Sequence, residues 1–187
     1  MTRHFTDRRG LYQYSSVQIN APAILADQVI DWGNKMIVDK DVYCPPDDLI
    51  HGREDEVHVT LLYGIHSHTP DESKILLSEQ APFEVKFGQV SIFTTNYEFD
   101  VVKIEVIGSG LFVLNNILKS NIKNTTCYNC FKPHATIAYI KKNTCNNLIG
   151  NNNFNGWKWT ANSLVFSSTS GQKSPIRLNT LRPVLCS

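Results

Sequence analysis

The chain has 187 residues and a formal net charge of +1, with 42% hydrophobic and 19% charged residues. This balance predicts one soluble globular domain over residues 1–187, with residues 1–11 as a flexible polar segment before its folded part. The near-neutral charge excludes the basic excess typical of proteins that bind long duplex nucleic acid.

Hydrophobic periodicity predicts a mixed α/β (α+β) chain. A strand over residues 12–19 is followed by a helix over 23–38, in which Leu25, Val29, Trp32 and Met36 form one apolar face. Residues 39–55 are expected to form a long loop that holds Pro45-Pro46 and Gly52. The other expected elements are a strand at 57–63, a helix from Thr69 to about 80, strands at 83–93 and 99–107, a helix at 111–122, and strands at 133–140, 157–167 and 176–184. Gly88 is expected to mark a bulge or turn within 83–93, and the Asn-rich stretch 143–155 a loop.

Two of the predicted strands carry the same short pattern of polar residues. His58-Val59-Thr60 lies in the first, and His134-Ala135-Thr136 lies in the second. Alternate residues of a strand point to opposite faces, so each imidazole shares a face with the hydroxyl two residues later. On neighbouring strands, the two motifs would bring two imidazoles and two hydroxyls to one place.

This set of groups suits displacement at the phosphorus of a nucleotide diester. An imidazole gives or takes a proton near neutral pH, so one histidine serves as general base and the other as general acid. Threonine hydroxyls donate hydrogen bonds to the non-bridging phosphate oxygens. The scheme needs no metal and no other cofactor. A single His-x-Thr in a strand carries little information, whereas two copies are far more specific. Because the copies are nearly equivalent, the sequence leaves open which histidine is the base.

The two motifs and the order of strands and helices resemble the 2H phosphoesterase superfamily. The stretch Phe131-Lys132-Pro133-His134-Ala135-Thr136-Ile137-Ala138-Tyr139 is similar to that family's second motif. The resemblance covers about Tyr12 to Pro183. It implies a two-lobed, pseudo-symmetric fold with antiparallel-rich sheets, flanking helices and a central cleft. It also implies that His58 and His134 are the catalytic acid and base, with Thr60 and Thr136 as phosphate ligands.

A narrower resemblance points to a class of substrate. The run His58-Val59-Thr60-Leu61-Leu62-Tyr63-Gly64, with the strand at 83–93 and the stretch 97–103, resembles phage proteins of the 2H group. Some of those are anti-CBASS nucleases, which destroy cyclic oligonucleotide signals of bacterial immunity. This implies a cyclic di- or trinucleotide substrate. The superfamily also contains 2′,5′-oligoadenylate phosphodiesterases, 2′,3′-cyclic phosphodiesterases and RNA-end-processing enzymes, which remain alternatives.

A small nucleotide or cyclic oligonucleotide is therefore the expected partner. Tyr12, Tyr14 and Trp159 are the candidates for stacking on its bases, and Lys132 is a candidate for attracting its phosphate. A protein that sequesters a nucleotide without cleaving it is an alternative of another class, but binding alone would not need two imidazoles. The charged run 53–56 is expected to be solvated; the alternative is that Glu56, which would share a face with His58, orients its imidazole. The oligomeric state is not predicted.

The cysteines favour a reducing compartment and supply a third alternative. Five cysteines at irregular spacing are not typical of a disulfide framework, and the sequence shows no signal peptide and no apolar run of about 18 residues. We therefore expect a cytoplasmic protein (in the host cytoplasm if viral) without a membrane partner. A zinc-stabilised interaction protein would depend on Cys127 and Cys130. No second pair completes a known ligand spacing, so free thiols are expected there.

Overall fold

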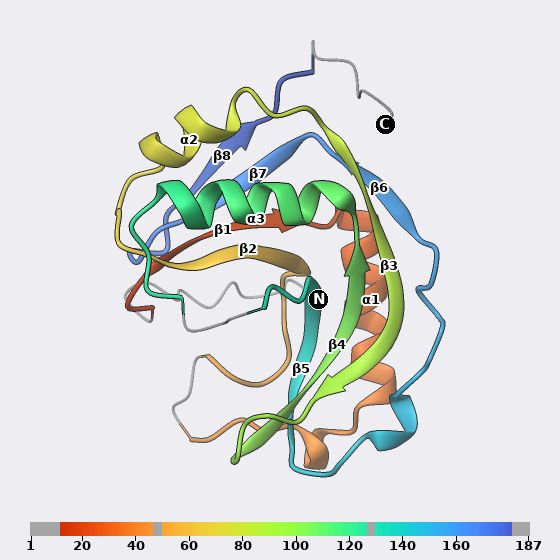
Figure 1. Cartoon of the computed structure of the whole chain (residues 1–187). Coiled ribbons are helices and arrows are strands. Elements are labelled where there is room, and N and C mark those ends of the chain that lie inside the picture. The colour runs from red at the N-terminus through yellow and green to blue at the C-terminus, as the bar shows by residue number, and fades with distance from the viewer. Residues whose placement is uncertain (1–11, 47–49, 127–129, 181–187) are drawn as a thin grey trace.

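A computed structural model of the chain describes residues 12–46, 50–126 and 130–180. Within these ranges the chain forms eight strands, three α-helices and two short 3-10 helices (Figure 1). In chain order they are β1 (Ser15–Asn20), α1 (Ala23–Met36), η1 (Asp39–Asp41), β2 (His58–Ile65), α2 (Asp71–Leu77), β3 (Phe83–Phe93), β4 (Phe99–Ile107), α3 (Ser109–Asn121), β5 (His134–Lys141), η2 (Asn146–Leu148), β6 (Lys158–Ala161), β7 (Ser163–Ser167) and β8 (Lys173–Arg177).

The strands form one antiparallel sheet with the order β6-β3-β4-β5-β2-β1-β7-β8. Two groups of four strands, β6-β3-β4-β5 and β2-β1-β7-β8, therefore meet at the central pair β5 and β2. Figure 1 shows the sheet strongly curled, with β1 and β2 running across the view and β4 and β5 running steeply through it. This is the mixed, two-lobed, antiparallel-rich architecture predicted from the sequence.

Each of the longer helices covers a central strand. Helix α1 packs on β5, α3 packs on β2 and β3, and α2 packs on β8 and α3. The approach of α1 is so close that a Cβ atom at Gly33 would lie 2.6 Å from Cγ2 of Ile137. On α3, Nδ2 of Asn115 donates a 2.7 Å hydrogen bond to the carbonyl oxygen of Leu61. Since α1 follows β1 but packs on β5, while α3 follows β4 but packs on β2, the helices join the two lobes.

The predicted elements are largely confirmed in place and type, and the errors lie near the C-terminus. The strands at 83–93 and 99–107 are found with the predicted bounds, and a register shift occurs between Phe87 and Val90 as expected for Gly88. The single strand predicted at 157–167 is wrong, because the chain breaks at Asn162 and pairs β6 with β3 but β7 with β1. The last strand is β8, earlier than the predicted 176–184, whose end lies outside the described residues.

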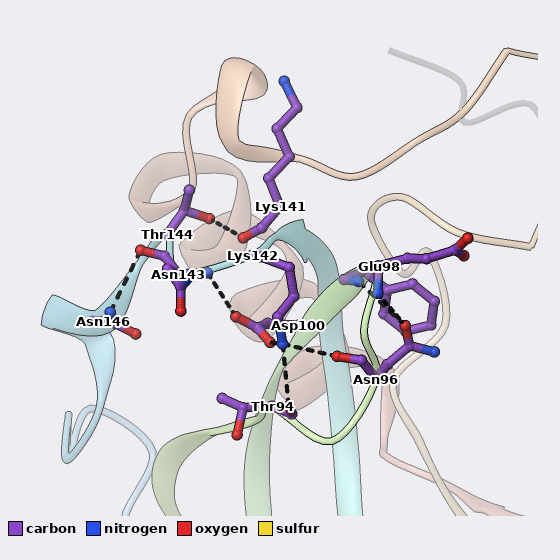
Figure 2. Close-up of polar contacts among 10 residues, drawn as sticks. Thr94, Asn96, Glu98, Asp100, Lys141, Lys142, Asn143, Thr144 and Asn146 are labelled. Atoms are coloured by element: carbon purple, nitrogen blue, oxygen red, sulfur yellow. Dashed lines mark hydrogen bonds and ion pairs between the residues drawn. The ribbon is translucent and has the colours of Figure 1, made fainter.

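A polar network fixes the end of β5 that lies farthest from His134 (Figure 2). The Asp100 carboxylate, whose side chain is 1% exposed, accepts hydrogen bonds from Lys142 Nζ at 2.5 Å and from the Asn143 backbone N–H at 2.8 Å. Lys142 Nζ also donates to the carbonyl oxygens of Thr94 and Asn96, in the turn between β3 and β4. The network thus ties the β3–β4 turn to the chain that leaves β5.

Candidate active site

The two His-x-Thr motifs lie side by side on the central strands. Val59 of β2 pairs in antiparallel register with Ala135 of β5. This register places His58 opposite Thr136 and Thr60 opposite His134. Val59 and Ala135 are 1% and 0% exposed, whereas the four polar residues are partly exposed on the other face. The two imidazoles are therefore diagonal neighbours on one face, at a typical spacing of about 7 to 8 Å between backbones.

Both imidazoles are held by the same local contact. Nδ1 of His58 lies 3.0 Å from the carbonyl oxygen of Glu56, and Nδ1 of His134 lies 2.7 Å from that of Lys132. A carbonyl oxygen only accepts hydrogen bonds, so the contact assigns the proton of each neutral ring to Nδ1. Nε2 of each ring is then the atom available for proton transfer.

A bulge follows each motif and returns a tyrosine to the same face. The extra residue is Leu61 on β2 and Ile137 on β5, as the register with the neighbouring strands shows. Without a bulge, the residue three positions after a threonine would point to the opposite face. With it, Tyr63 and Tyr139 lie on the face of the histidines, and both motifs read His-x-Thr-x-x-Tyr. The repeated tyrosine is visible in the sequence, but strict alternation alone would place it on the opposite face.

Tyr63 belongs to a first aromatic cluster, made of Tyr12, Tyr14, Tyr63 and His66. The Tyr12 and Tyr14 rings contact the Tyr63 ring edge-on at 6.4 and 6.2 Å between centroids. The Tyr14 ring also stacks on His66 at 5.2 Å. The Tyr63 side chain is 38% exposed. The two tyrosines predicted to bind bases therefore lie beside the end of β2, next to the motif face.

Tyr139 belongs to a second aromatic cluster, made of Tyr43, His51, Phe99 and Tyr139. The Tyr139 ring lies 4.8 Å from His51 and 5.4 Å from Phe99, and Tyr43 contacts both of these rings. Because β2 and β5 are antiparallel, the two clusters lie toward opposite ends of the central pair. The sequence did not indicate this cluster, because Tyr43 and His51 come from the polar stretch that was expected to be a loop.

The other two predicted substrate ligands have different positions. Trp159 lies on the edge strand β6, which β3 and β4 separate from β5, and its ring packs on the fully buried Phe87 at 4.9 Å. The structure therefore does not bring Trp159 to the four motif side chains. Lys132 is exposed two residues before His134 and lies beside them.

On the His58 side, a carboxylate lies within a network of polar side chains. Glu56 accepts hydrogen bonds from Nδ2 of Asn20 at 2.6 Å and Nε2 of Gln18 at 3.4 Å, and it forms an ion pair with Lys173. Burial raises the pKa of Glu56, but the ammonium of Lys173 and the charge of His58 bring the pKa below its usual value. The carboxylate is consequently charged at neutral pH.

The charged run 53–56 was expected to be solvated, but the structure shows specific partners for Arg53 as well as for Glu56. Arg53 donates hydrogen bonds to the carbonyl oxygens of Gly33 at 3.1 Å and Ile37 at 2.6 Å, at the end of α1, and pairs with Asp39 at 2.8 Å. The prediction was wrong because a charged tetrapeptide does not reveal that the loop folds back on the end of a helix. These contacts hold the segment that leads into β2.

On the His134 side, the neighbouring strand β4 carries a buried lysine. Lys103 of β4 pairs in register with Thr136 and is 7% exposed. Its ammonium donates a 2.6 Å hydrogen bond to Oγ of Ser91 and lies 4.3 Å from the centroid of Phe93. The Phe93 ring in turn contacts the His134 ring at 4.8 Å. The sequence does not reveal that Lys103 is buried, because a lysine in an alternating strand is usually a surface residue.

These surroundings favour the neutral form of His134. Burial lowers its pKa, the hydrogen bond with the Lys132 carbonyl raises it, and the charges of Lys103 and His58 lower it further. The net result is a pKa below the ordinary 6.5. Burial also lowers the pKa of Lys103, with a smaller lowering by Lys132 and an opposing effect of Glu105. Lys103 therefore brings positive charge to this side of the face, opposed by the carboxylate of Glu105, which pairs in register with His134.

Among residues 12–46, 50–126 and 130–180, no three His, Cys, Asp or Glu side chains gather as they would around a metal ion. Cys127, on which the zinc alternative depends, lies outside the described residues, and Cys130 is exposed with a free thiol. In the same part of the chain, none of the helices has the length and apolar character needed to cross a bilayer.

The fold is the two-lobed fold of the LigT-like 2H phosphoesterases. Solved structures with this fold include TT0787 of Thermus thermophilus, with 13% identity and a TM-score of 0.63 over 91% of this chain and 100% of that one. LigT of E. coli complexed with 3′-AMP shares 21% identity, with a TM-score of 0.59 over 89% and 95% of the two chains. Usb1 of Kluyveromyces marxianus with uridine monophosphate shares 8% identity, with a TM-score of 0.50 over 88% and 98%. No family model matches the sequence, and no curated protein matches it.

Proposed function

We propose that the protein is a phosphodiesterase that cleaves a small or cyclic oligonucleotide by acid–base catalysis with two histidines. The observation that carries the proposal is the register of Val59 with Ala135, which places two imidazoles and two hydroxyls in a diagonal arrangement on one face. The matching carbonyl contacts of His58 and His134 support it, because they leave Nε2 of both rings for proton transfer.

The reaction follows from the chemistry of these four groups. One imidazole, neutral at the start, takes the proton of a water or of the substrate's own 2′-hydroxyl as that oxygen bonds to phosphorus. The other imidazole, protonated at the start, gives its proton to the oxygen whose bond to phosphorus breaks. Thr60 and Thr136 donate hydrogen bonds to the non-bridging oxygens, where negative charge is concentrated. Attack by a 2′-hydroxyl would release a 2′,3′-cyclic phosphate. One imidazole accepts the proton of the attacking oxygen and the other supplies the proton of the leaving oxygen. Because the scheme needs no metal ion for these transfers, activity in EDTA is expected.

The choice of a nucleotide rests on two observations. The solved structures with this fold include LigT with 3′-AMP, LigT with NADP+ and Usb1 with uridine monophosphate. The first aromatic cluster lies next to the motif face and offers partly exposed rings on which a base can stack. Within this class we favour cyclic di- or trinucleotides, as in the degradation of bacterial immune signals by anti-CBASS nucleases.

A panel of substrates tests the proposal. The protein is incubated in EDTA with cyclic dinucleotides, cyclic trinucleotides, linear 2′,5′-oligoadenylate and nucleoside 2′,3′-cyclic phosphates, and the products are separated by chromatography. We expect cleavage of cyclic oligonucleotides. Cleavage of linear 2′,5′-oligoadenylate alone would contradict the cyclic substrate but retain the phosphodiesterase. Tight binding of a nucleotide with no product would contradict catalysis and favour a sequestering protein.

A further inference from the structure

The ammonium of Lys103 is buried beside the proposed catalytic groups and forms no ion pair with the described residues, in contrast to Arg53, Lys142, Lys158 and Lys173. The carboxylate of Glu105, two residues along β4, opposes the lowering of the Lys103 pKa but makes no direct ion pair with the ammonium. Its polar partner is the neutral hydroxyl of Ser91, and its other neighbour is the face of Phe93. Burying a charge is costly unless an opposite charge compensates it. An anionic ligand would supply that compensation.

The position of the ammonium indicates which anionic group of a ligand would bind to it. Lys103 pairs with Thr136, but its Nζ atom reaches the side chains of β3, which lies beyond β4 from the central pair. Neighbouring strands are about 4.8 Å apart, so β3 is roughly 10 Å from β5. The ammonium is thus displaced sideways from the phosphate that Thr60 and Thr136 would hold. This displacement suits a neighbouring phosphate of the same nucleotide chain better than the phosphate that is cleaved.

The other lobe has no equivalent cation at this position. Gln18 pairs with Thr60 just as Lys103 pairs with Thr136. The Gln18 amide donates to Asn20 and Glu56, so it belongs to a network already balanced by Lys173. The two lobes therefore share their four motif residues but differ at the paired positions, where β4 carries the charged Lys103 and Glu105 and β1 carries the neutral Gln18 and Asn20. A ligand with a second phosphate would bind in one direction only.

We propose that Lys103, together with Ser91, binds a second phosphate of the substrate, adjacent to the phosphate that is cleaved. This inference rests on the proposed phosphodiesterase function and narrows its substrate class. The substrate carries at least two phosphates separated by a nucleoside, as in a cyclic dinucleotide or a linear oligonucleotide. A nucleoside 2′,3′-cyclic monophosphate has no second phosphate for the Lys103 ammonium to bind and would be a poor substrate.

Matched linear substrates test this directly. A dinucleoside monophosphate, which has one phosphate, is compared with the same molecule bearing an added phosphate at its 5′ end or at its 3′ end. A hydrogen bond to a charged group corresponds to roughly a ten- to hundredfold change in affinity, so one of the two phosphorylated forms should show a KM lower by that factor. In Lys103→Met and in Ser91→Ala the advantage should shrink, and Lys103→Arg should retain part of it. Lys119→Met, on the exposed surface of α3, is the matched control and should keep the full advantage.

The outcomes separate this inference from the proposed function. A wild-type protein with no preference for either phosphorylated form would overturn the second-phosphate site. An equal loss on all three substrates in Lys103→Met would also overturn it, because the lysine would then act at the cleaved phosphate. Absence of cleavage of every substrate by the wild type would instead contradict the phosphodiesterase function. Melting temperatures of Lys103→Met and Ser91→Ala identify a variant that fails to fold, and the other variant then decides the question.

Discussion

Replacement of each motif histidine by alanine tests the proposed catalytic pair. His58 and His134 lie on the partly exposed face of β2 and β5, while the interior face is formed by Val59 and Ala135. Truncation of either ring therefore removes a proton-transfer group without opening the core. We expect both variants to fold and both to lose most of their turnover.

The expected size of the loss follows from the role of each ring. General acid or base help contributes about 10²- to 10⁴-fold per group. This range corresponds to roughly 2.7 to 5.4 kcal/mol of transition-state stabilisation, since each tenfold is about 1.36 kcal/mol. The two rings serve one displacement, so His58→Ala/His134→Ala should lose much less than the product of the single effects.

The assay is kcat/KM on the best substrate of the panel, with thermal unfolding as a check of the fold. His68→Ala is the matched control, because His68 is an exposed histidine outside both motifs, with Nδ1 3.2 Å from the hydroxyl of Thr169. Near-wild-type turnover in either His58→Ala or His134→Ala would remove that residue from the mechanism. A loss in His68→Ala as large as in the motif variants would show that the effect is not specific to the pair.

Three further measurements probe the surroundings of the pair. In an NMR titration of the free protein, His134 should titrate below pH 6.5, and Lys103→Met should move that titration to higher pH because a neighbouring positive charge is removed; an unchanged midpoint would contradict the electrostatic contact. Lys142→Met leaves the buried Asp100 carboxylate without its ion pair, so the free energy of unfolding should fall by about 3–5 kcal/mol in urea, whereas a loss below about 1 kcal/mol would mean that the network is dispensable. Tyr63→Ala should raise KM by an amount equivalent to about 1–3 kcal/mol while affecting kcat less, and an unchanged KM would exclude the first aromatic cluster from base binding.

The sequence was sufficient to predict most elements of the sheet and the shared face of the two polar residues in each motif. Alternation is a local property, so it correctly placed His58 with Thr60 and His134 with Thr136 on one face of each strand. The pairing of β2 with β5 was expected only from the repetition of the motif, and the structure supplies the register that joins Val59 to Ala135.

The sequence could not predict features that depend on distant segments. The face of Tyr63 and Tyr139 is set by one extra residue in each strand, which becomes visible only in the register with the neighbouring strands. Lys103 resembles an ordinary surface lysine until β3 covers it with Ser91. Similarly, the split of residues 157–167 into β6 and β7 reflects a change of partner strand, which leaves the local pattern unaltered.

The two motifs are alike in sequence, but their surroundings in the folded protein assign them different tasks. Burial and the positive charge of Lys103 lower the pKa of His134 and so disfavour its protonated form. His58 lies two residues after Glu56, whose carboxylate is charged because Lys173 and the charge of His58 lower its pKa against the opposing effect of burial. We therefore expect His134 to act as the general base and His58 as the general acid.

A substrate whose leaving group needs no proton distinguishes these roles. With a nucleoside p-nitrophenyl phosphodiester, the nitrophenolate departs as an anion, so a general acid contributes little. The loss in His58→Ala should shrink to less than about tenfold on this substrate, whereas the loss in His134→Ala should remain about 10²- to 10⁴-fold, because the attacking oxygen still needs a base. The opposite pattern would reverse the assignment. Equal losses in both variants would mean that the charges of Lys103 and Glu56 do not set the direction of proton transfer.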